Sequence, residues 1–421
     1  MTYTFQRTSL RSSETGGVTV LLRAAATCCM LLASACGDDA SPAANSAGSG
    51  GSGGGGGSGG NGGSSDAGPD SGTDAGPSGP GGTIQVLSSA PELRAPTTAA
   101  VRGNNLWVVN GQLSGLFGGP APVLPFNVVS VPLTGGPIGD TSIALPGDTF
   151  YPEGIAAAAD GTLYVGSVNT RVIVQVPADS TTPSVFVPEG VAERGVIGLT
   201  VDDTRNLLWF CDSNPAAAVP GAAIVGVSLD DGSEVVRHAM PNPGGAPAPD
   251  AGSAPDAGTV ADAGASDAGS APPPAAAPAS FCNDLIVDAT GNLFATDSSG
   301  RIFRVPANAV LAPNSASVWL TGPAAAPATA GGFGANGIDL VGGTLIIANG
   351  DALWAVNPNA SDPASTARKL ALTLDGAPAT LCGPDGLQTV PGSSTDLVVI
   401  ENGSCNATGD SDRVVRIQLS L

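Results

Sequence analysis

A unit of short strands recurs along this sequence, and its spacing restricts the fold more than any other feature. Residues 281–305 read FCNDLIVDATGNLFATDSSGRIFRV, with alternating apolar and polar residues and turn residues at Thr290-Gly291 and Ser298-Ser299-Gly300. This pattern predicts three strands, at 285–288, 292–296 and 301–305, joined by tight turns into an antiparallel meander. A fourth apolar segment follows at 316–320.

Related units begin near residues 97, 151, 195, 335 and 383. The equivalent apolar positions in five first strands are Ile155, Leu199, Leu285, Ile338 and Leu387. Their separations lie in the forties and low fifties, apart from the interval that contains a low-complexity tract over 241–279. Four strands per unit at this period predict an all-β fold, a six-bladed β-propeller with four-stranded blades.

The sixth unit shows three strands before the sequence reaches Leu421. We expect a lone N-terminal strand at 83–87 to supply the fourth and to close the ring, because closure removes an exposed sheet edge. The propeller domain is thus predicted to span 83–421. An open solenoid is the structural alternative, and it would leave both ends without caps.

The first 82 residues have a different character. Residues 1–35 contain three arginines before a short apolar stretch, as in a signal peptide. They end in Leu32-Ala33-Ser34-Ala35-Cys36, which resembles a bacterial lipobox with Cys36 as the acylated residue. The alternative is ordinary cleavage after Ala35, which leaves a free thiol. Residues 36–82 are rich in Gly, Ser and Asp, so we predict a disordered tether there and a disordered insert at 241–279.

Charge and histidine content exclude several classes of function. The formal net charge is −21 with 15 Lys and Arg residues, which argues against nucleic acid and anionic lipid surfaces as partners. The same acidity is compatible with a hard cation such as calcium. The one histidine, His238, rules out a zinc site with several histidines, and we expect it to be an ordinary strand residue.

Four cysteines lie outside the leader and Cys36. Cys282 and Cys382 directly precede predicted first strands, and Cys211 and Cys405 follow second strands that open on the same face. In an exported chain we predict the disulfides Cys211–Cys282 and Cys382–Cys405, although four cysteines allow three connectivities and buried thiols are the alternative. The tryptophans fall in strands, where we expect them to pack between blades: Trp107, Trp209, Trp319 and Trp354.

Polar residues just ahead of the first strands are the candidate site. In a propeller these positions converge at one mouth of the central channel, and here they are Glu153, Asn283, Asn336 and Asp385. Two carboxylates and two amide oxygens suit calcium or another divalent cation. The alternative is structural, because Asn, Asp and Gly before a strand are good turn formers.

The motifs around these positions resemble those of the senescence-marker-protein/gluconolactonase family, whose architecture is related to paraoxonase and diisopropylfluorophosphatase. That family carries Glu, Asn, Asn and Asp in this order at blade starts around one metal. The matching motifs are YPEGI, CNDLIVDATGN, ANGIDL and GPDGL, within residues 151–421. The resemblance implies metal ligation by Glu153, Asn283, Asn336 and Asp385, with Asp385 also the general base and Asp284 supporting the ligands from behind.

The resemblance implies metal-dependent hydrolysis of a lactone or ester. The lipobox-like segment separately predicts a lipoprotein of the cell envelope, anchored to the membrane through Cys36. A non-catalytic propeller that binds a protein partner at the cell surface is the second hypothesis. Two departures favour it: the family's arginine before the first Asn is replaced by Ser280-Phe281-Cys282, and the insert at 241–279 opens on the same face. We expect a monomer in either case.

Overall fold

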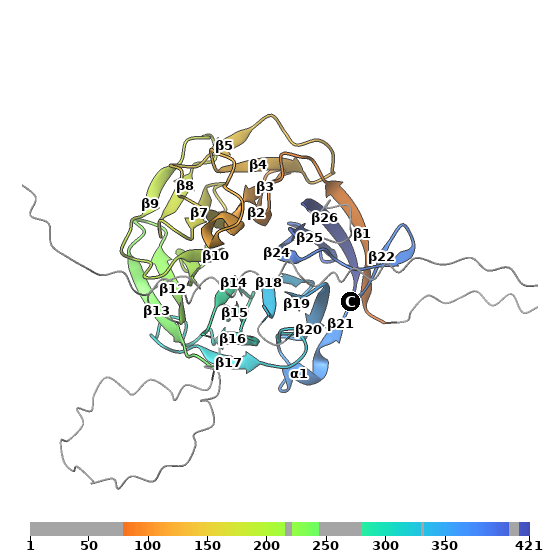
Figure 1. Ribbon diagram of the computed structural model, residues 1–421. Coiled ribbons are helices and arrows are strands. Elements are labelled where there is room, and N and C mark those ends of the chain that lie inside the picture. The colour runs from red at the N-terminus through yellow and green to blue at the C-terminus, as the bar shows by residue number, and fades with distance from the viewer. Residues whose placement is uncertain (1–78, 215–220, 244–278, 330–331, 404–411) are drawn as a thin grey trace, which may run out of the picture. The chain divides into compact units, whose positions relative to one another are not determined.

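Six β-sheets are arranged in a ring in the computed structural model (Figure 1). The structure describes residues 79–214, 221–243, 279–329, 332–403 and 412–421, all within the compact unit Gly62–Leu421. The predicted signal peptide at 1–35, Cys36, most of the tether and most of the insert therefore lie outside the described residues. Within them, no helix has the length and apolar character needed to cross a bilayer.

Each sheet is a blade, and in the first five blades the strands pair in chain order from the centre outward. The first three blades are β2 (Pro96–Arg102), β3 (Asn105–Asn110), β4 (Asn127–Pro132), β5 (Ser142–Ala144); β6 (Pro152–Ala157), β7 (Leu163–Ser167), β8 (Ile173–Val176), β9 (Ser184–Val187); and β10 (Val196–Asp202), β11 (Leu207–Asp212), β12 (Ala222–Ser228), β13 (Glu234–Met240). The next two are β14 (Cys282–Val287), β15 (Leu293–Asp297), β16 (Arg301–Val305), β17 (Ser317–Leu320); and β18 (Ala335–Val341), β19 (Thr344–Asn349), β20 (Ala352–Val356), β21 (Arg368–Lys369).

The sixth blade joins the two ends of the described chain. It contains β24 (Pro384–Thr389), β25 (Asp396–Glu401), β26 (Arg413–Ser420) and β1 (Gly81–Ser88), and β1 pairs antiparallel with β26. The predicted closure by the N-terminal strand is confirmed. The strand begins at Gly81, two residues before the predicted boundary, because Gly81 and Gly82 continue the pairing with Ser420 and Leu419.

One predicted strand is divided between two blades. The run RKLAL at residues 368–372 indicates one outer strand of the fifth blade, but only β21 pairs with β20. The next segment, β22 (Ala371–Leu374), pairs in parallel with β1 and carries the hairpin strand β23 (Ala377–Ala379). Leu370 and Leu372 are both buried in the apolar cluster between the fifth and sixth blades. Burial of these two side chains stabilises the path in which the chain crosses from the fifth blade to the sixth.

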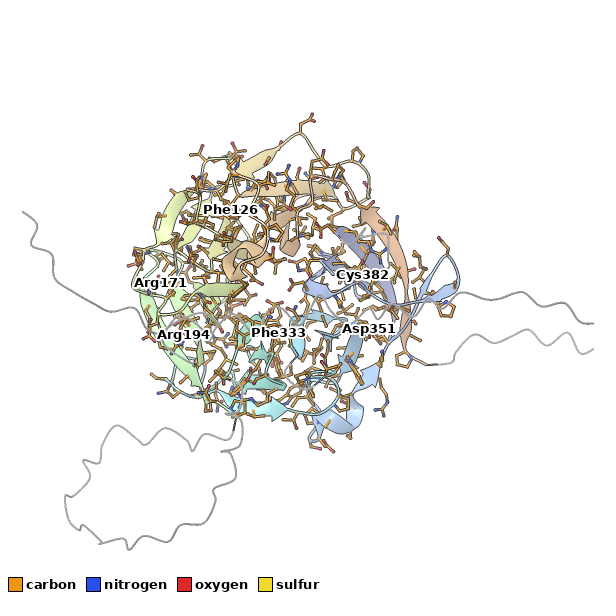
Figure 2. All side chains as sticks on the ribbon, in the orientation of Figure 1. Phe126, Arg171, Arg194, Phe333, Asp351 and Cys382 are labelled. Carbon is orange, nitrogen blue, oxygen red and sulfur yellow. A yellow bond between two sulfur atoms is a disulfide. The ribbon has the colours of Figure 1, made fainter. Side chains whose placement is uncertain are left out.

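Apolar side chains fill the spaces between neighbouring blades (Figure 2). Trp107 packs in the cluster of the first and second blades, and Trp209 in that of the third and fourth. Trp319 and Trp354 are partly buried against the cluster of the fourth and fifth. The predicted packing role of the tryptophans is confirmed.

His238 is a buried strand residue, as predicted. Its Nε2 lies 3.0 Å from the carbonyl oxygen of Val310, and its Nδ1 accepts a hydrogen bond of 3.1 Å from Ser315 N. Burial lowers the pKa of the imidazole. Both ring nitrogens are satisfied in the neutral form, so His238 contributes to packing between the third and fourth blades, where it stacks on Trp209.

Candidate metal centre

All six innermost strands contain the same irregularity near the start. The register shifts between Pro96 and Ala99 in the first blade, and equivalent shifts follow between Pro152 and Ile155, Val196 and Leu199, Cys282 and Leu285, Ala335 and Ile338, and Pro384 and Leu387. Two residues in each strand therefore form a bulge. The first bulge residues are Thr97, Glu153, Ile197, Asn283, Asn336 and Asp385.

This placement corrects one detail of the prediction. The four candidate ligands were expected in turns ahead of the first strands, but they lie within β6, β14, β18 and β24 at the second residue of each. A bulge interrupts the alternation of inward and outward side chains along a strand and changes their direction. A bulged position can therefore resemble a turn in the sequence although it belongs to the sheet. The bulge also repeats at equal depth in every blade, which puts the four side chains at one level of the channel.

Glycine is the second bulge residue in four blades, at Gly154, Gly198, Gly337 and Gly386. A Cβ at Gly154 would collide with the carbonyl oxygen of Ile197 in the next blade, and a Cβ at Gly337 would collide with that of Asp385. The inner strands therefore approach one another backbone to backbone. This contact narrows the ring and brings side chains from different blades close together.

Glu153 is buried, with 3% of its surface exposed, and its Oε2 has no hydrogen-bond partner. Burial raises the pKa of its carboxyl well above the usual range, and the charges of Asp385 and Asp284 raise it further. Thr97 and Thr98 of the neighbouring blade both donate to the carbonyl oxygen of Glu153, which secures the backbone beneath the side chain. Glu153 is thus a buried carboxyl group on a secured backbone, with an unpartnered oxygen and the charges of two other acids nearby.

Asp385 is held by two amides. Asn402 Nδ2 donates to its Oδ2 at 2.6 Å, and the side chain of Asn336 also bonds to it. Burial nonetheless raises the pKa of Asp385 to about 7. The buried Oδ1 of Asn336 has no hydrogen-bond partner. Asn336 therefore presents an unused acceptor next to a carboxylate.

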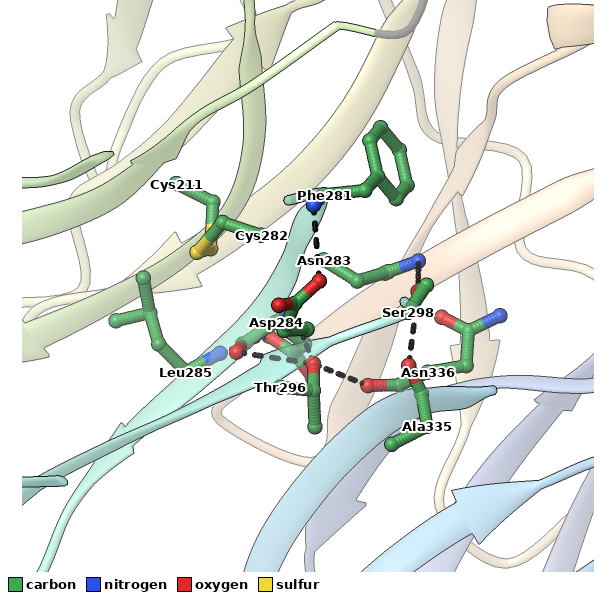
Figure 3. The surroundings of a disulfide bond; sticks show 11 residues. Cys211, Phe281, Cys282, Asn283, Asp284, Leu285, Thr296, Ser298, Ala335 and Asn336 are labelled. Atoms are coloured by element: carbon green, nitrogen blue, oxygen red, sulfur yellow. Dashed lines mark hydrogen bonds between the residues drawn. A yellow bond between two sulfur atoms is a disulfide. The ribbon is translucent and has the colours of Figure 1, made fainter. Parts of the chain in front are cut away.

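Asn283 joins this group through Ser298 (Figure 3). Its Nδ2 donates to Ser298 Oγ at 3.2 Å, and Ser298 Oγ donates to the carbonyl oxygen of Ala335, the residue before Asn336. The hydrogen bond to Ser298 orients the Asn283 amide through its nitrogen, so the amide oxygen takes no part in that bond. The structure thus links Glu153 with Asp385, Asp385 with Asn336, and Asn283 with the strand of Asn336.

Asp284, the residue after Asn283, connects two inner strands through backbone hydrogen bonds. Its Oδ2 accepts from Ile338 N at 3.1 Å and its Oδ1 from Leu285 N at 2.8 Å, so it ties β14 to β18. Asp339 repeats this arrangement one blade on, where it accepts from Leu340 N and Thr389 N. Burial raises the pKa of Asp284 to about 7 and that of Asp339 to about 6. Both acids line a channel cavity of about 150 Å³.

Sequence reasoning missed Asn402, Ser298 and Asp339. Ser298 and Asn402 directly follow the second strands of their blades, and each bonds to the bulge residue of its own blade. An alignment of the six repeated units at the ends of their second strands would have identified Ser298 and Asn402 as candidate site residues. Asp339 was hidden because its position lies inside a strand, where alternation alone indicates only a polar residue.

The donor set fits a hard cation. Glu153 Oε2 and Asn336 Oδ1 are buried acceptors without donors, and none of the ion pairs in the described part of the chain involves Glu153 or Asp385. Leaving such groups without a partner is costly, and a calcium ion accepts carboxylate and amide oxygens together. Among the described residues no three His, Cys, Asp or Glu side chains are grouped for a metal, so a cation held here would need the amide oxygens as well.

A disulfide joins Cys211 of β11 to Cys282 of β14, the pairing predicted between the third and fourth blades (Figure 3). Cys282 directly precedes Asn283, so a covalent link holds the backbone of one candidate ligand. Cys382 is also disulfide-bonded. Its predicted partner, Cys405, lies outside the described residues, and that pairing stays a prediction.

Comparisons with known proteins identify the architecture. No protein-family model matches the chain, and no curated protein matches its sequence. Solved structures do match. A luciferin-regenerating enzyme is 12% identical over 80% of this chain and 95% of its own, with a TM-score of 0.50. Its fold is that of the gluconolactonase-type six-bladed propellers. At this identity the likeness concerns the fold alone.

Two further solved structures also match. Regucalcin from Agrobacterium tumefaciens, described as a calcium-binding protein, is 13% identical over 80% of this chain and 95% of its own, with a TM-score of 0.49. A putative gluconolactonase is 13% identical over 82% of this chain and 93% of its own, with a TM-score of 0.46.

The buried acids predict how stability depends on pH in a calcium-free propeller. Glu153, Asp284, Asp339 and Asp385 all have raised pKa values, so they remain protonated in the folded state where the unfolded chain has lost those protons. The free energy of unfolding should therefore fall as pH rises from about 4, the unfolded pKa, through about 7. Denaturant midpoints in EGTA are expected to be higher at pH 5 than at pH 8. Asp339→Asn should flatten this trend, and a midpoint that rises with pH in wild type would contradict it.

Proposed function

We propose that the ring centre binds a divalent cation, calcium in the first place, through Glu153, Asn283, Asn336 and Asp385, and hydrolyses a lactone or ester there. The observation that carries the proposal is the pair of buried acceptors without donors, Glu153 Oε2 and Asn336 Oδ1, beside the carboxyl of Asp385. A bound cation would polarise the substrate carbonyl and lower the pKa of a bound water.

The residues of this chain supply the remaining parts of the reaction. Asn402 and Asn336 hold the Asp385 carboxyl in one orientation, and its pKa of about 7 suits a base that accepts a proton from water near neutral pH. Ser298 orients Asn283, and the backbone bonds of Asp284 keep β14 and β18 at their spacing.

Calcium titration followed by a hydrolysis assay tests this proposal. Calcium at 100 times its Kd is expected to add about 2.7 kcal/mol to stability, which raises the Tm by several degrees over the protein in EGTA. With calcium the protein should hydrolyse phenyl acetate or a lactone, and Asp385→Asn should abolish turnover. Binding without turnover would leave the second hypothesis, a non-catalytic binding module. No calcium effect on Tm would remove the metal site itself.

We also propose that the protein is a lipoprotein of the cell envelope, acylated at Cys36 and linked to the propeller by the tether at 36–82. The Cys211–Cys282 disulfide supports an oxidising compartment. In a bacterial host, the chain is expected to partition into Triton X-114 detergent and to incorporate labelled palmitate, and Cys36→Ser should lose both. A chain that stays in the aqueous phase would contradict the anchor.

A further inference from the structure

The rim above the candidate metal centre is apolar and aromatic. Phe281 and Phe333 lie with their ring centroids 5.7 Å apart, and Phe333 is 47% exposed. In Figure 2, Phe333 lies close to the centre of the ring, and in Figure 3 the Phe281 side chain extends just above Asn283. An exposed phenylalanine in tilted contact with a second one, at the mouth of a buried polar site, calls for an explanation.

Both phenylalanines are tied to the ligand-bearing backbone. Ser298 N donates to the carbonyl oxygen of Phe281 at 2.9 Å, and Gly334 N, next to Phe333, donates to that of Ser298 at 2.7 Å. Ser298 Oγ in turn accepts from Asn283. The aromatic pair is thus positioned by the same residue that orients a candidate ligand.

A short turn from the first blade extends this apolar surface. The 3-10 turn η2 (Leu113–Phe117), orange in Figure 1, lies at the inner side of the ring. Leu113 and Leu116 pack both against the cluster of the first and second blades and against that of the third and fourth, where Phe281 also packs. The turn therefore reaches across the mouth from the Glu153 side to the Asn283 side.

The arginines around this mouth are already engaged. Arg194 pairs with Asp212, Arg301 with Asp297, and Arg413 with Glu401, and each of these acids is fully buried at the end of a second strand. They hold the loops that lead into the inner strands, as Asp297 does through Phe281 N. These three arginines are therefore committed to the scaffold.

We propose that Phe281 and Phe333, with Leu113 and Leu116, bind the apolar acyl or aryl part of the substrate, which makes the substrate a hydrophobic lactone or ester. The inference rests on the proposed function, because it places the substrate carbonyl at the centre below. When the carbonyl group of the substrate points toward Glu153 and Asn336, the alkyl substituent of the substrate lies beside Phe281 and Phe333. Burial of that apolar substituent against the two rings contributes to affinity. A polar substituent in the same place would lose its hydration without gaining hydrogen-bond partners.

Binding of ketone analogues tests the proposal separately from catalysis, because a cyclic ketone mimics a lactone and is not hydrolysed. Calorimetry with calcium would compare cyclopentanone, 2-pentylcyclopentanone and gluconate. Affinity should rise about fourfold per methylene that enters the rim. Phe333→Ser should weaken binding of the pentyl ketone at least fivefold, and Phe333→Leu should restore most of it. Val185→Ser, on the outer strand β9 at a residue 59% exposed, is the matched control.

The outcomes separate the two proposals. Chain-length-dependent binding that Phe333→Ser weakens supports the apolar rim, even if no ester or lactone is turned over and the hydrolase proposal fails. Equal affinity for the short and pentyl ketones, or an unchanged affinity in Phe333→Ser, overturns it. Tighter binding of gluconate than of the pentyl ketone also overturns it, whether or not Asp385→Asn abolishes turnover.

Discussion

Replacing Glu153 with Gln is expected to stabilise the calcium-free protein and to remove most of its affinity for calcium. The wild-type carboxyl is buried and its pKa is raised by burial and by the charges of Asp385 and Asp284. At pH 8 Glu153 is ionised and solvated in the unfolded chain, so folding carries the free-energy cost of protonating or desolvating this carboxylate. The Gln side chain of the variant is neutral in both states and has no such cost. The gain should be on the order of 1–3 kcal/mol at pH 8 and should vanish at pH 4.

The same change removes one of two carboxylates from the candidate ligand set. Calcium affinity depends on ligand charge, so we expect Kd to rise on the order of 100-fold. Urea denaturation in EGTA and calcium calorimetry measure the two effects. Glu189→Gln, at an exposed residue paired with Arg171, should change neither by much. Calcium binding that is unaffected by Glu153→Gln would remove this residue from the site, and a less stable calcium-free variant would contradict the electrostatic account.

Gly154→Ala is expected to destabilise the propeller by on the order of 3 kcal/mol or more. The added Cβ would collide with the carbonyl oxygen of Ile197 in the next blade, and a backbone atom in a paired strand cannot rotate away. Relief would require separation of two inner strands and loss of packing between their blades. The denaturant midpoint measures the loss, and calcium affinity should fall as well because Glu153 is the preceding residue.

Gly79→Ala is the matched control, since a Cβ there would meet nothing within 4 Å. It should leave the midpoint within about 0.5 kcal/mol of wild type. Gly337→Ala should behave like Gly154→Ala, because its Cβ would meet the carbonyl oxygen of Asp385. Stability equal to wild type in both bulge variants would show that the inner strands are not in backbone contact.

Much of the architecture followed from local pattern. Alternation and turn residues located most strands to within one or two residues, and the spacing of Ile155, Leu285 and Ile338 was sufficient to predict six blades. Closure by the strand near Thr83 could be deduced because the last unit lacked a strand. The segment 368–372 could not be placed, because its division between β21 and β22 depends on which neighbouring core buries Leu370 and Leu372.

The sequence by itself determined the order of blades, and it predicted the four candidate ligands and the Cys211–Cys282 pair, because each depends on periodicity and on position within a repeated unit. Only the tertiary structure placed those ligands inside bulged strands, with Asn402 on Asp385, Ser298 on Asn283 and the two phenylalanines above. These relations join residues from different strands or blades, so no local propensity encodes them. They arise because glycines at the second bulge position in four of the six blades let neighbouring inner strands approach closely, and this packing leaves Glu153 Oε2 and Asn336 Oδ1 buried without donors.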